Sequence, residues 1–288
     1  HMPAIDEPAP ISRVLSTPRS GTRHHQFVAG NFFMQRVFAR YRDDLQLPPT
    51  SAELSQAAER TERYLAERAA TLTVSGMARR EGRVEADISV ENLGGHKLPT
   101  AYPSRRAWLH VTLRDAAGRI LFESGALHAD GSIEGNDNDL DPRRYEPHYR
   151  EVRQPDQVQI YEAILGDLHD AVTTGLLSAT GYLKDNRLLP HGFDKGSASA
   201  NVAVHGDALA DPSFTDQGDV VHYSMAVPAD AIGPIRLEAE FLYQPVGYRW
   251  ANNLRNYDAY EPRRFVAMYE SMANGTATTM ATAAGVVR

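Results

Sequence analysis

The sequence predicts a mainly β protein with N-terminal helices: a helical pair, an antiparallel β-sandwich and a short C-terminal helix. Apolar residues recur at helical spacing up to about residue 70, and beyond it the period changes from 3.6 to 2. Short turn signals such as Glu81-Gly82 separate the later segments, which indicates antiparallel neighbours. We therefore expect an extended arm and helical pair over 1–70, a β-sandwich over 71–250, and a C-terminal helix and tail over 251–288.

The helical pair is predicted by periodicity and by start and stop signals. The segment 25–45 has a broad apolar face with a spacing of three or four residues, and Pro48 ends it. Thr50 and Glu53 then form a capping box that opens a second helix over 51–70.

The strands are predicted by alternation and by β-branched residues. The segments with this pattern are TLTVSGMARR, RVEADISVEN, AWLHVTLRD, RILFESG, VVHYSMAVP and IRLEAEFLYQP. We also expect a strand at 158–165 and a helix around 262–272. The low-polarity tail 274–288 is expected to lie extended against another element.

Composition excludes several functional classes. The 288 residues carry a net charge of −7, and the arginines are scattered among carboxylates, so no basic field for nucleic acid or anionic lipid is visible in the sequence. The absence of cysteine excludes disulfides, thiolate metal sites, a cysteine nucleophile and covalent c-type haem within these residues. No apolar run approaches the roughly 20 residues of a membrane span.

Three aspartates suggest a metal site. Asp137, Asp139 and Asp141 alternate along an irregular loop, and hard oxygen ligands at this spacing suit calcium. The alternative is a solvated turn whose side chains bond their own backbone. The eleven histidines form no H-x-H or H-E-x-x-H pattern, but His96, His148 and neighbouring carboxylates leave a metalloenzyme as a third hypothesis.

Other polar residues favour structural roles. Glu146 and His148 are expected to be buried and to anchor their loop, with an acid/base pair as the alternative. An internal bidentate ion pair is expected between Asp185 and Arg187. For Arg105 and Arg106 we expect carboxylate partners inside the domain, with Asp185 the candidate. His96 is expected to be a buried, hydrogen-bonding histidine, with a ligand as the alternative.

Several stretches together resemble a known domain. HKLPTAYPSRRAWLHV, GRILFESG, DQVQIYEAIL, YLKDNRLLPHGF and EFLYQPV resemble the non-haem β-domain at the C-terminal end of multihaem c-type cytochromes. The usual family pattern is GHxLPTGYPSRRAW, and this chain has Ala101 where glycine is usual. HHQFVAGNFF also resembles the segment after the last haem-binding motif of those proteins. The resemblance spans about residues 24–250.

The resemblance implies haem ligands only in a longer protein. Because the family attaches haem through C-x-x-C-H, c-type haem is expected only in an upstream region and not in this chain. His1-Met2-Pro3 has two interpretations: the native end of such a motif, with His1 the proximal ligand of the final haem, or residue from an expression tag. His24 or His25 is the candidate for the opposite axial position. Two axial histidines suit electron transfer.

These observations lead to one expected function and two alternatives. The chain is expected to be a non-catalytic, periplasmic or cell-surface domain that caps the last haem and supports electron transfer or partner docking. Its expected partner is the upstream haem domain or a redox protein, with no nucleic acid and no membrane span. The alternatives are a calcium-dependent extracytoplasmic binding module and, less favoured, the His/carboxylate metalloenzyme.

Overall fold

The computed structural model describes residue 2 and the ranges 4–12, 14–23 and 28–288. The chain divides into two compact units, His1–Tyr64 and Leu65–Arg288.

The first unit contains an arm and two helices. Within the arm, isolated bridges join Ala4 to Arg23 and Ala9 to Arg19, so its two halves run antiparallel. The helices are α1 (Phe32–Arg40) and α2 (Ser51–Arg68), whose last turn continues into the second unit.

The predicted helix signals are confirmed, and contacts between α1 and α2 hold the pair together. Glu53 accepts from the Thr50 backbone N–H at 2.8 Å, and the Thr50 hydroxyl accepts from the Glu53 N–H at 3.2 Å. This is the expected reciprocal capping box. Arg36 pairs with Glu62 at 2.7 Å between the helices. The first helix is shorter than 25–45, because turns follow Arg40.

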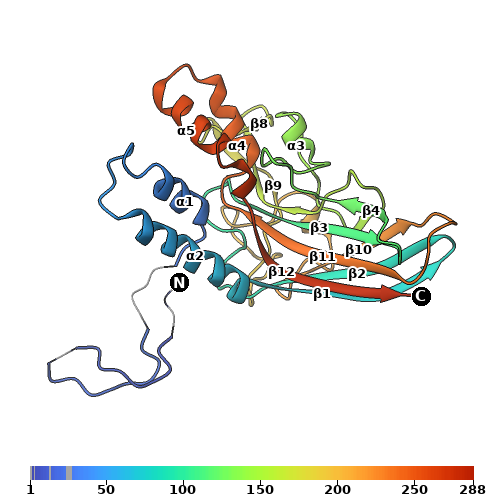
Figure 1. Ribbon diagram of the computed structural model, residues 1–288, viewed down its shortest axis with the longest axis horizontal. Coiled ribbons are helices and arrows are strands. Elements are labelled where there is room, and N and C mark those ends of the chain that lie inside the picture. Colours follow the sequence, from blue (N-terminus) through green and yellow to red (C-terminus); the bar gives the residue numbers. More distant parts are fainter. Residues whose placement is uncertain (1, 3, 13, 24–27) are drawn as a thin grey trace. The chain divides into compact units, whose positions relative to one another are not determined.

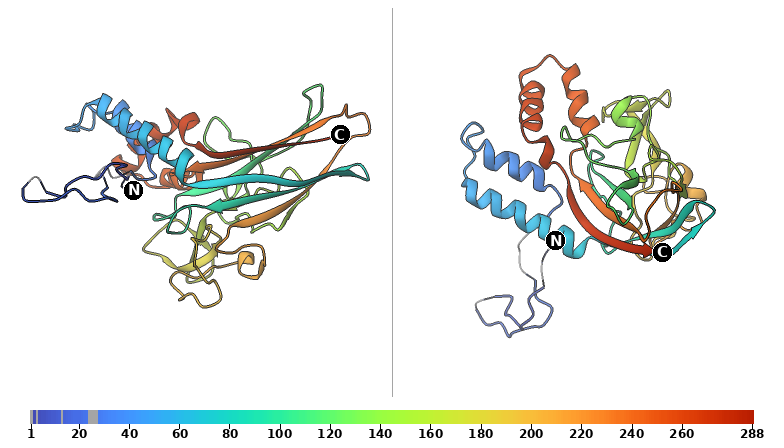
Figure 2. Two further views of the ribbon diagram at one scale, coloured as in Figure 1. Left: turned by 90° about the horizontal axis from the view of Figure 1, so that it is seen from below. Right: turned by 45° about the vertical axis from the view of Figure 1, so that its right-hand side comes forward.

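The second unit is built on three sheets (Figures 1 and 2). The first has the order β1 (Ala70–Arg80), β2 (Arg83–Asn92), β10 (Asp219–Ala226), β5 (Glu151–Val152). The second has the order β12 (Thr278–Val287), β11 (Ile235–Gln244), β3 (Arg106–Arg114), β4 (Ile120–Ser124), and β6 (Ile160–Tyr161) also pairs with β3. The third has the order β8 (Val172–Thr173), β7 (Ala163–Asp167), β9 (Ala179–Asp185). The β10–β5 pair is parallel and the other pairs of these strands are antiparallel.

Burial explains which strands alternate in sequence. β2 and β11 alternate buried and partly buried residues, because one face of each is in the core. β3 is buried on both faces, which accounts for the imperfect alternation of its sequence. Trp108 on β3 is fully buried with Val158 and Ile160. Gly218, directly before β10, is required for close packing, because its φ is +116° and a Cβ there would collide with the Val90 backbone oxygen.

Helices complete the second unit. They are α3 (Asp137–Leu140), α4 (Tyr248–Asn253), α5 (Tyr260–Glu270) and the 3-10 helices Asp207–Ala210, Leu254–Asn256 and Ala273–Gly275. The expected C-terminal helix is α5, and the expected extended tail is β12. The strand predicted at 158–165 is present as β6 and β7, interrupted at Glu162. The mainly β fold class with helices is confirmed. No helix within the described residues is long and apolar enough to span a membrane.

Candidate functional site

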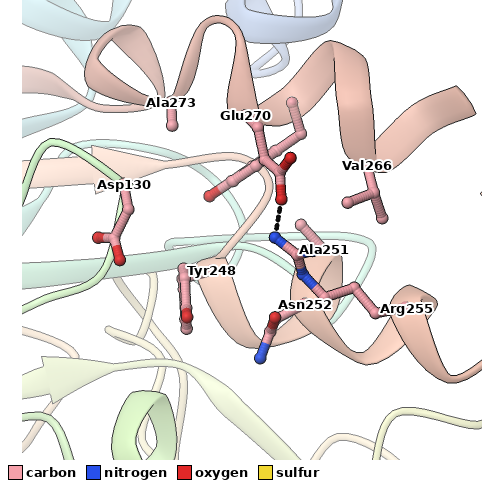
Figure 3. Close-up of a pocket in the computed structure, with 9 residues that line it drawn as sticks. Asp130, Tyr248, Ala251, Asn252, Arg255, Val266, Glu270 and Ala273 are labelled. Carbon is pink, nitrogen blue, oxygen red and sulfur yellow. Dashed lines mark ion pairs between the residues drawn. The ribbon is translucent and has the colours of Figure 1, made fainter. Parts of the chain in front are cut away.

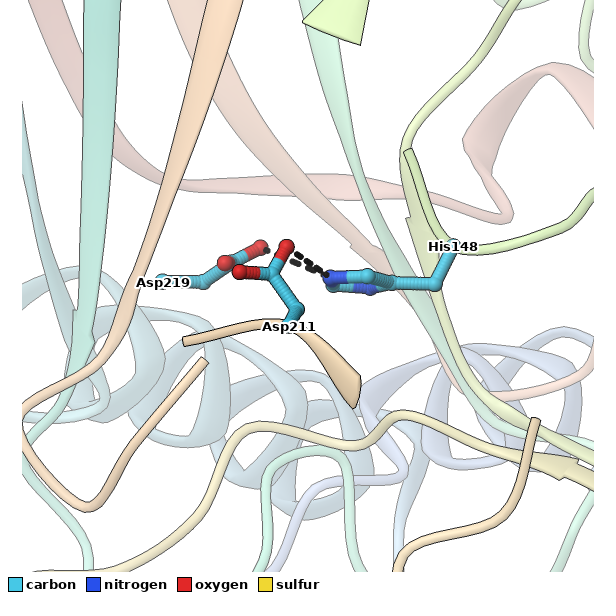
Figure 4. Close-up of side chains that lie close together, drawn as sticks. All are labelled: His148, Asp211 and Asp219. Carbon is cyan, nitrogen blue, oxygen red and sulfur yellow. Dashed lines mark ion pairs between the residues drawn. The ribbon is translucent and has the colours of Figure 1, made fainter. Parts of the chain in front are cut away.

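A buried cluster of His148, Asp211 and Asp219 joins three segments of the second unit (Figure 4). His148 lies on the loop between α3 and β5, Asp211 follows a 3-10 helix, and Asp219 begins β10. Nε2 of His148 is 3.3 Å from Oδ2 of Asp211 and 3.8 Å from Oδ2 of Asp219. Within the described residues, no other three His, Asp or Glu side chains place ligand atoms within 4.8 Å of one another. The cluster is therefore the candidate for a metal centre.

Hydrogen bonds around the imidazole determine its tautomer. Nδ1 of His148 faces the side-chain nitrogens of Gln159 at 2.9 Å and of Asn186 at 3.1 Å. Both amides are held in this orientation, because their oxygens accept the backbone N–H groups of Tyr149 and Glu162. Amide NH₂ groups donate, so Nδ1 is an acceptor and the hydrogen of the neutral ring is on Nε2.

This tautomer does not fit a metal. A metal-bound histidine normally donates its other N–H to a carboxylate or carbonyl. Here Nε2, which faces the aspartates, carries the hydrogen, and Nδ1 is surrounded by donors. The Nε2–H group is instead directed at the carboxylates, with Asp211 at 3.3 Å, slightly beyond a normal hydrogen bond. Nε2 of His148 and Oδ2 of Asp211 are both buried without a hydrogen-bond partner, so what argues against a metal here is the pair of amide donors at Nδ1.

Burial changes the protonation of the cluster in opposite directions. Burial and the Lys184 charge lower the pKa of His148 to about 4, although Asp211 opposes this. Burial and the Asp211 charge raise the pKa of Asp219 to about 6, although a hydrogen bond from the Tyr161 hydroxyl at 2.7 Å opposes this. The fold therefore favours the neutral forms of both groups.

A second buried network surrounds Asp139. Arg106 donates from both terminal nitrogens to the two carboxylate oxygens of Asp139, each at 2.8 Å, and from Nε to Gln244 at 2.7 Å. Arg249 donates to the backbone oxygen of Asp139 at 2.6 Å. The Ile133 N–H also donates to the carboxylate at 2.9 Å. Arg106 is thus an internal residue, as expected, but its predicted partner Asp185 was wrong.

The three candidate calcium ligands have arginine partners. Asp137 pairs with Arg144 at 2.5 Å and Asp141 with Arg143 at 2.9 Å, while Asp139 is in the network just described. Calcium binding by Asp137, Asp139 and Asp141 stays a prediction. The candidate haem ligands His1, His24 and His25 lie outside the described residues.

Asp185 does not bind Arg105 or Arg106, for which it was the candidate partner. It accepts from Arg187 through both oxygens at 2.8 and 2.7 Å, which confirms the bidentate pair, and from Lys97 at 2.8 Å. Arg105 donates to the Thr100 carbonyl instead. Sequence reasoning missed Lys97, because nothing local connects it to a carboxylate 88 residues away.

The remaining candidate residues are structural. His96 is half-buried, with Nδ1 3.0 Å from the Lys97 carbonyl. Glu146 is buried and accepts from the Tyr149 hydroxyl at 2.7 Å and the Asp137 N–H at 3.0 Å. Glu146 and His148 both anchor the loop, but they do so through separate partners.

A pocket of about 250 Å³ lies beside α4 and α5 (Figure 3). Tyr248, Asn252 and Val266 contribute to its wall, and an ion pair between Arg255 and Glu270 crosses it. No sequence motif predicts this pocket, because its lining comes from α4, α5 and their neighbouring turns together with Asp130 of a distant loop. The ion pair already satisfies its two charged groups.

Comparisons with known proteins are sparse. No family model matches the chain, and no curated protein matches it. Among solved structures, the chain is similar to the penta-heme cytochrome c552 from Thermochromatium tepidum, with 16% identity and a TM-score of 0.44. The alignment covers 78% of this chain and 41% of that one, so the chain spans less than half the length of that protein. A likeness of this strength supports no conclusion about haem, activity or partners.

Proposed function

We propose that this chain is the non-catalytic C-terminal domain of a multihaem c-type cytochrome, located outside the cytoplasm. In that protein the domain caps the last haem, excludes water from it and supports electron transfer or docking of a redox partner. Haem belongs to an upstream region, since this chain has no cysteine to attach it.

One observation carries the proposal: the five segments that resemble the cytochrome domain are bonded to one another inside the second unit. Segment 96–111 binds segment 182–193 through Lys97 and Asp185 at 2.8 Å, and through two backbone bonds between Leu98 and Leu188.

The other three segments join the same interior. Lys184 pairs with Glu162 of segment 156–165 at 3.0 Å. Arg106 donates to Gln244 of segment 240–246 at 2.7 Å. The Trp108 indole donates to the carbonyl of Gly125, the last residue of segment 118–125, at 2.9 Å.

These bonds give the shared residues a structural role. Buried polar groups need partners, so their positions are constrained together by the fold. Residues constrained in this way identify a type of domain rather than a reaction. Such a domain supports a neighbouring cofactor by controlling the access of water to it.

The test uses the complete native reading frame that contains this chain, expressed with a c-type cytochrome maturation system. A pyridine haemochrome assay should find several haems per polypeptide, and none in this chain expressed alone. Deleting this domain should move the potential of one haem to a more negative value, because water stabilises the ferric form. A native polypeptide without haem would contradict the proposal, and an unchanged potential after deletion would contradict the capping role.

A further inference from the structure

The fold collects scattered arginines at one end of the β-sandwich. Two hairpin turns, 79–83 and 114–120, and the connection 227–236 between β10 and β11 project there (Figure 2). The Ala116 N–H donates to the Ile232 carbonyl at 2.7 Å, and the Val227 N–H donates to the Gly82 carbonyl at 2.8 Å. These bonds hold the turns together, and the three ranges are called the basic tip.

The basic tip has the opposite charge to the chain. Its ranges contain the arginines 79, 80, 83, 114, 119 and 236 and the acids 81, 115 and 230, whereas the whole chain carries −7. The remainder is therefore strongly acidic. Arg236 and Arg83 have partners just outside the three ranges, Glu238 at 2.8 Å and Glu85 at 3.9 Å, so the excess positive charge that can face an anionic surface is carried by the remaining tip arginines.

Part of the positive charge is not neutralised by the tip's own acids. Asp115 and Asp230 both bind one arginine, Arg119. Within the described residues, Arg79 and Arg80 form no ion pair with a carboxylate. Both are exposed.

Apolar side chains project at the same end. Ile232 is 58% exposed near the apex of its turn, and Ile120 is 44% exposed at the start of β4. Val286, 58% exposed, lies on β12 beside Arg236 of the tip. Exposed large apolar groups beside arginines suit an interface with an apolar layer beneath an anionic one.

We propose that the basic tip docks on the surface of an anionic lipid bilayer. Arg79 and Arg80 contact the headgroups while Ile232 and Ile120 enter the boundary of the acyl chains. Projecting turns with apolar side chains can enter a bilayer surface, whereas an acidic protein surface would leave the isoleucines without an apolar layer to enter. The inference concerns a different end of the unit from α4 and α5, and it does not depend on haem.

The test is a vesicle co-sedimentation assay with the whole chain. Binding is expected to vesicles of equimolar phosphatidylcholine and phosphatidylglycerol, and not to phosphatidylcholine alone. An arginine near an anionic surface strengthens binding roughly fivefold, so R79E/R80E should weaken it by at least about 25-fold. I232N should weaken it further, and ~0.5 M salt should abolish most of it.

A matched control separates the tip from net charge. R60E/R63E makes the same charge change at two exposed positions of α2 and should leave vesicle binding within about twofold. Equal losses in both double variants would overturn the proposal. So would absence of binding to the anionic vesicles, including the case in which the chain binds soluble polyglutamate, which would indicate an acidic protein partner instead.

Discussion

Asp139 and Asp219 are both buried carboxylates in the second unit, and they differ in the charge of their partners. Asp139 is matched by a cation, because Arg106 binds both of its oxygens at 2.8 Å. Asp219 is matched by neutral donors, the Tyr161 hydroxyl at 2.7 Å and the Gln159 amide at 3.1 Å. Although burial opposes this, Asp139 raises the pKa of the Arg106 guanidinium, whereas burial raises the pKa of Asp219, which has only neutral donors.

The difference distinguishes an ion pair between β3 and α3 from a cluster whose protonation depends on pH. The ion pair between Arg106 and Asp139 connects β3 to α3. Asp219 shares its surroundings with His148, and burial favours the neutral form of both. The interior of the second unit therefore contains a buried ion pair, Arg106–Asp139, and a cluster in which the pKa values of His148 and Asp219 are shifted in opposite directions.

The largest loss of stability is expected from breaking the ion pair between Arg106 and Asp139. Arg106→Met leaves the Asp139 carboxylate buried without a cation, which should lower the free energy of unfolding by about 3–5 kcal/mol. Urea denaturation at pH 7 measures this. Arg143→Met is the matched control: it removes an ion pair whose arginine is 86% exposed, and it should lower the free energy of unfolding far less. Equal losses in the two variants would contradict the assignment of Arg106 as the main link.

The next effect is the pH dependence of stability that comes from the cluster of His148, Asp211 and Asp219, called the Asp219 cluster. The folded pKa of Asp219 is raised from 3.8 to about 6, so its contribution is full below pH 4 and is lost as pH rises through 6. The folded pKa of His148 is lowered from 6.5 to about 4, so its contribution is full above pH 6.5 and is lost as pH falls through 4. Each is worth about 3 kcal/mol, and the two slopes nearly cancel between pH 4 and 6.5.

Single variants should show separately how His148 and Asp219 make the free energy of unfolding depend on pH. Asp219→Asn removes the falling slope, so its stability relative to the parent should increase as pH rises from 4 to 6.5. His148→Gln removes the rising slope, so its relative stability should decrease over the same range. Urea denaturation at several pH values gives both trends. Two trends of the same sign would contradict the opposite pKa shifts of His148 and Asp219.

Short-range features of the fold could be predicted from sequence, and pairings over long separations could not. The Thr50–Glu53 capping box and the Asp185–Arg187 pair join residues two or three apart, so local rules were sufficient. The partner of Arg106 was wrong because Asp139 is 33 residues away and several carboxylates were equally available in the sequence.

The candidate sites show the same limit. His148 was identified as a buried anchor, but its companions Asp211 and Asp219 lie more than 60 residues further on and belong to no motif. Likewise, the arginines of the basic tip are scattered among carboxylates in the sequence and gather only because three connections between strands lie at one end. Charge in a sequence is counted by position, whereas a surface field depends on which turns are neighbours.

The smallest expected effect tests whether the Asp219 cluster binds metal at all. Because two amides donate to Nδ1 of His148, the hydrogen is on Nε2, and a metal would have to displace it and leave the donors without an acceptor. ¹⁵N NMR of the His148 ring at pH 7 should show the hydrogen on Nε2. Excess Zn²⁺ should shift the melting temperature of the parent no more than that of His148→Gln, since any binding by surface histidines is common to both. A Zn²⁺-dependent rise that is lost in His148→Gln, together with a hydrogen on Nδ1, would reverse the tautomer assignment and make the three residues a metal centre.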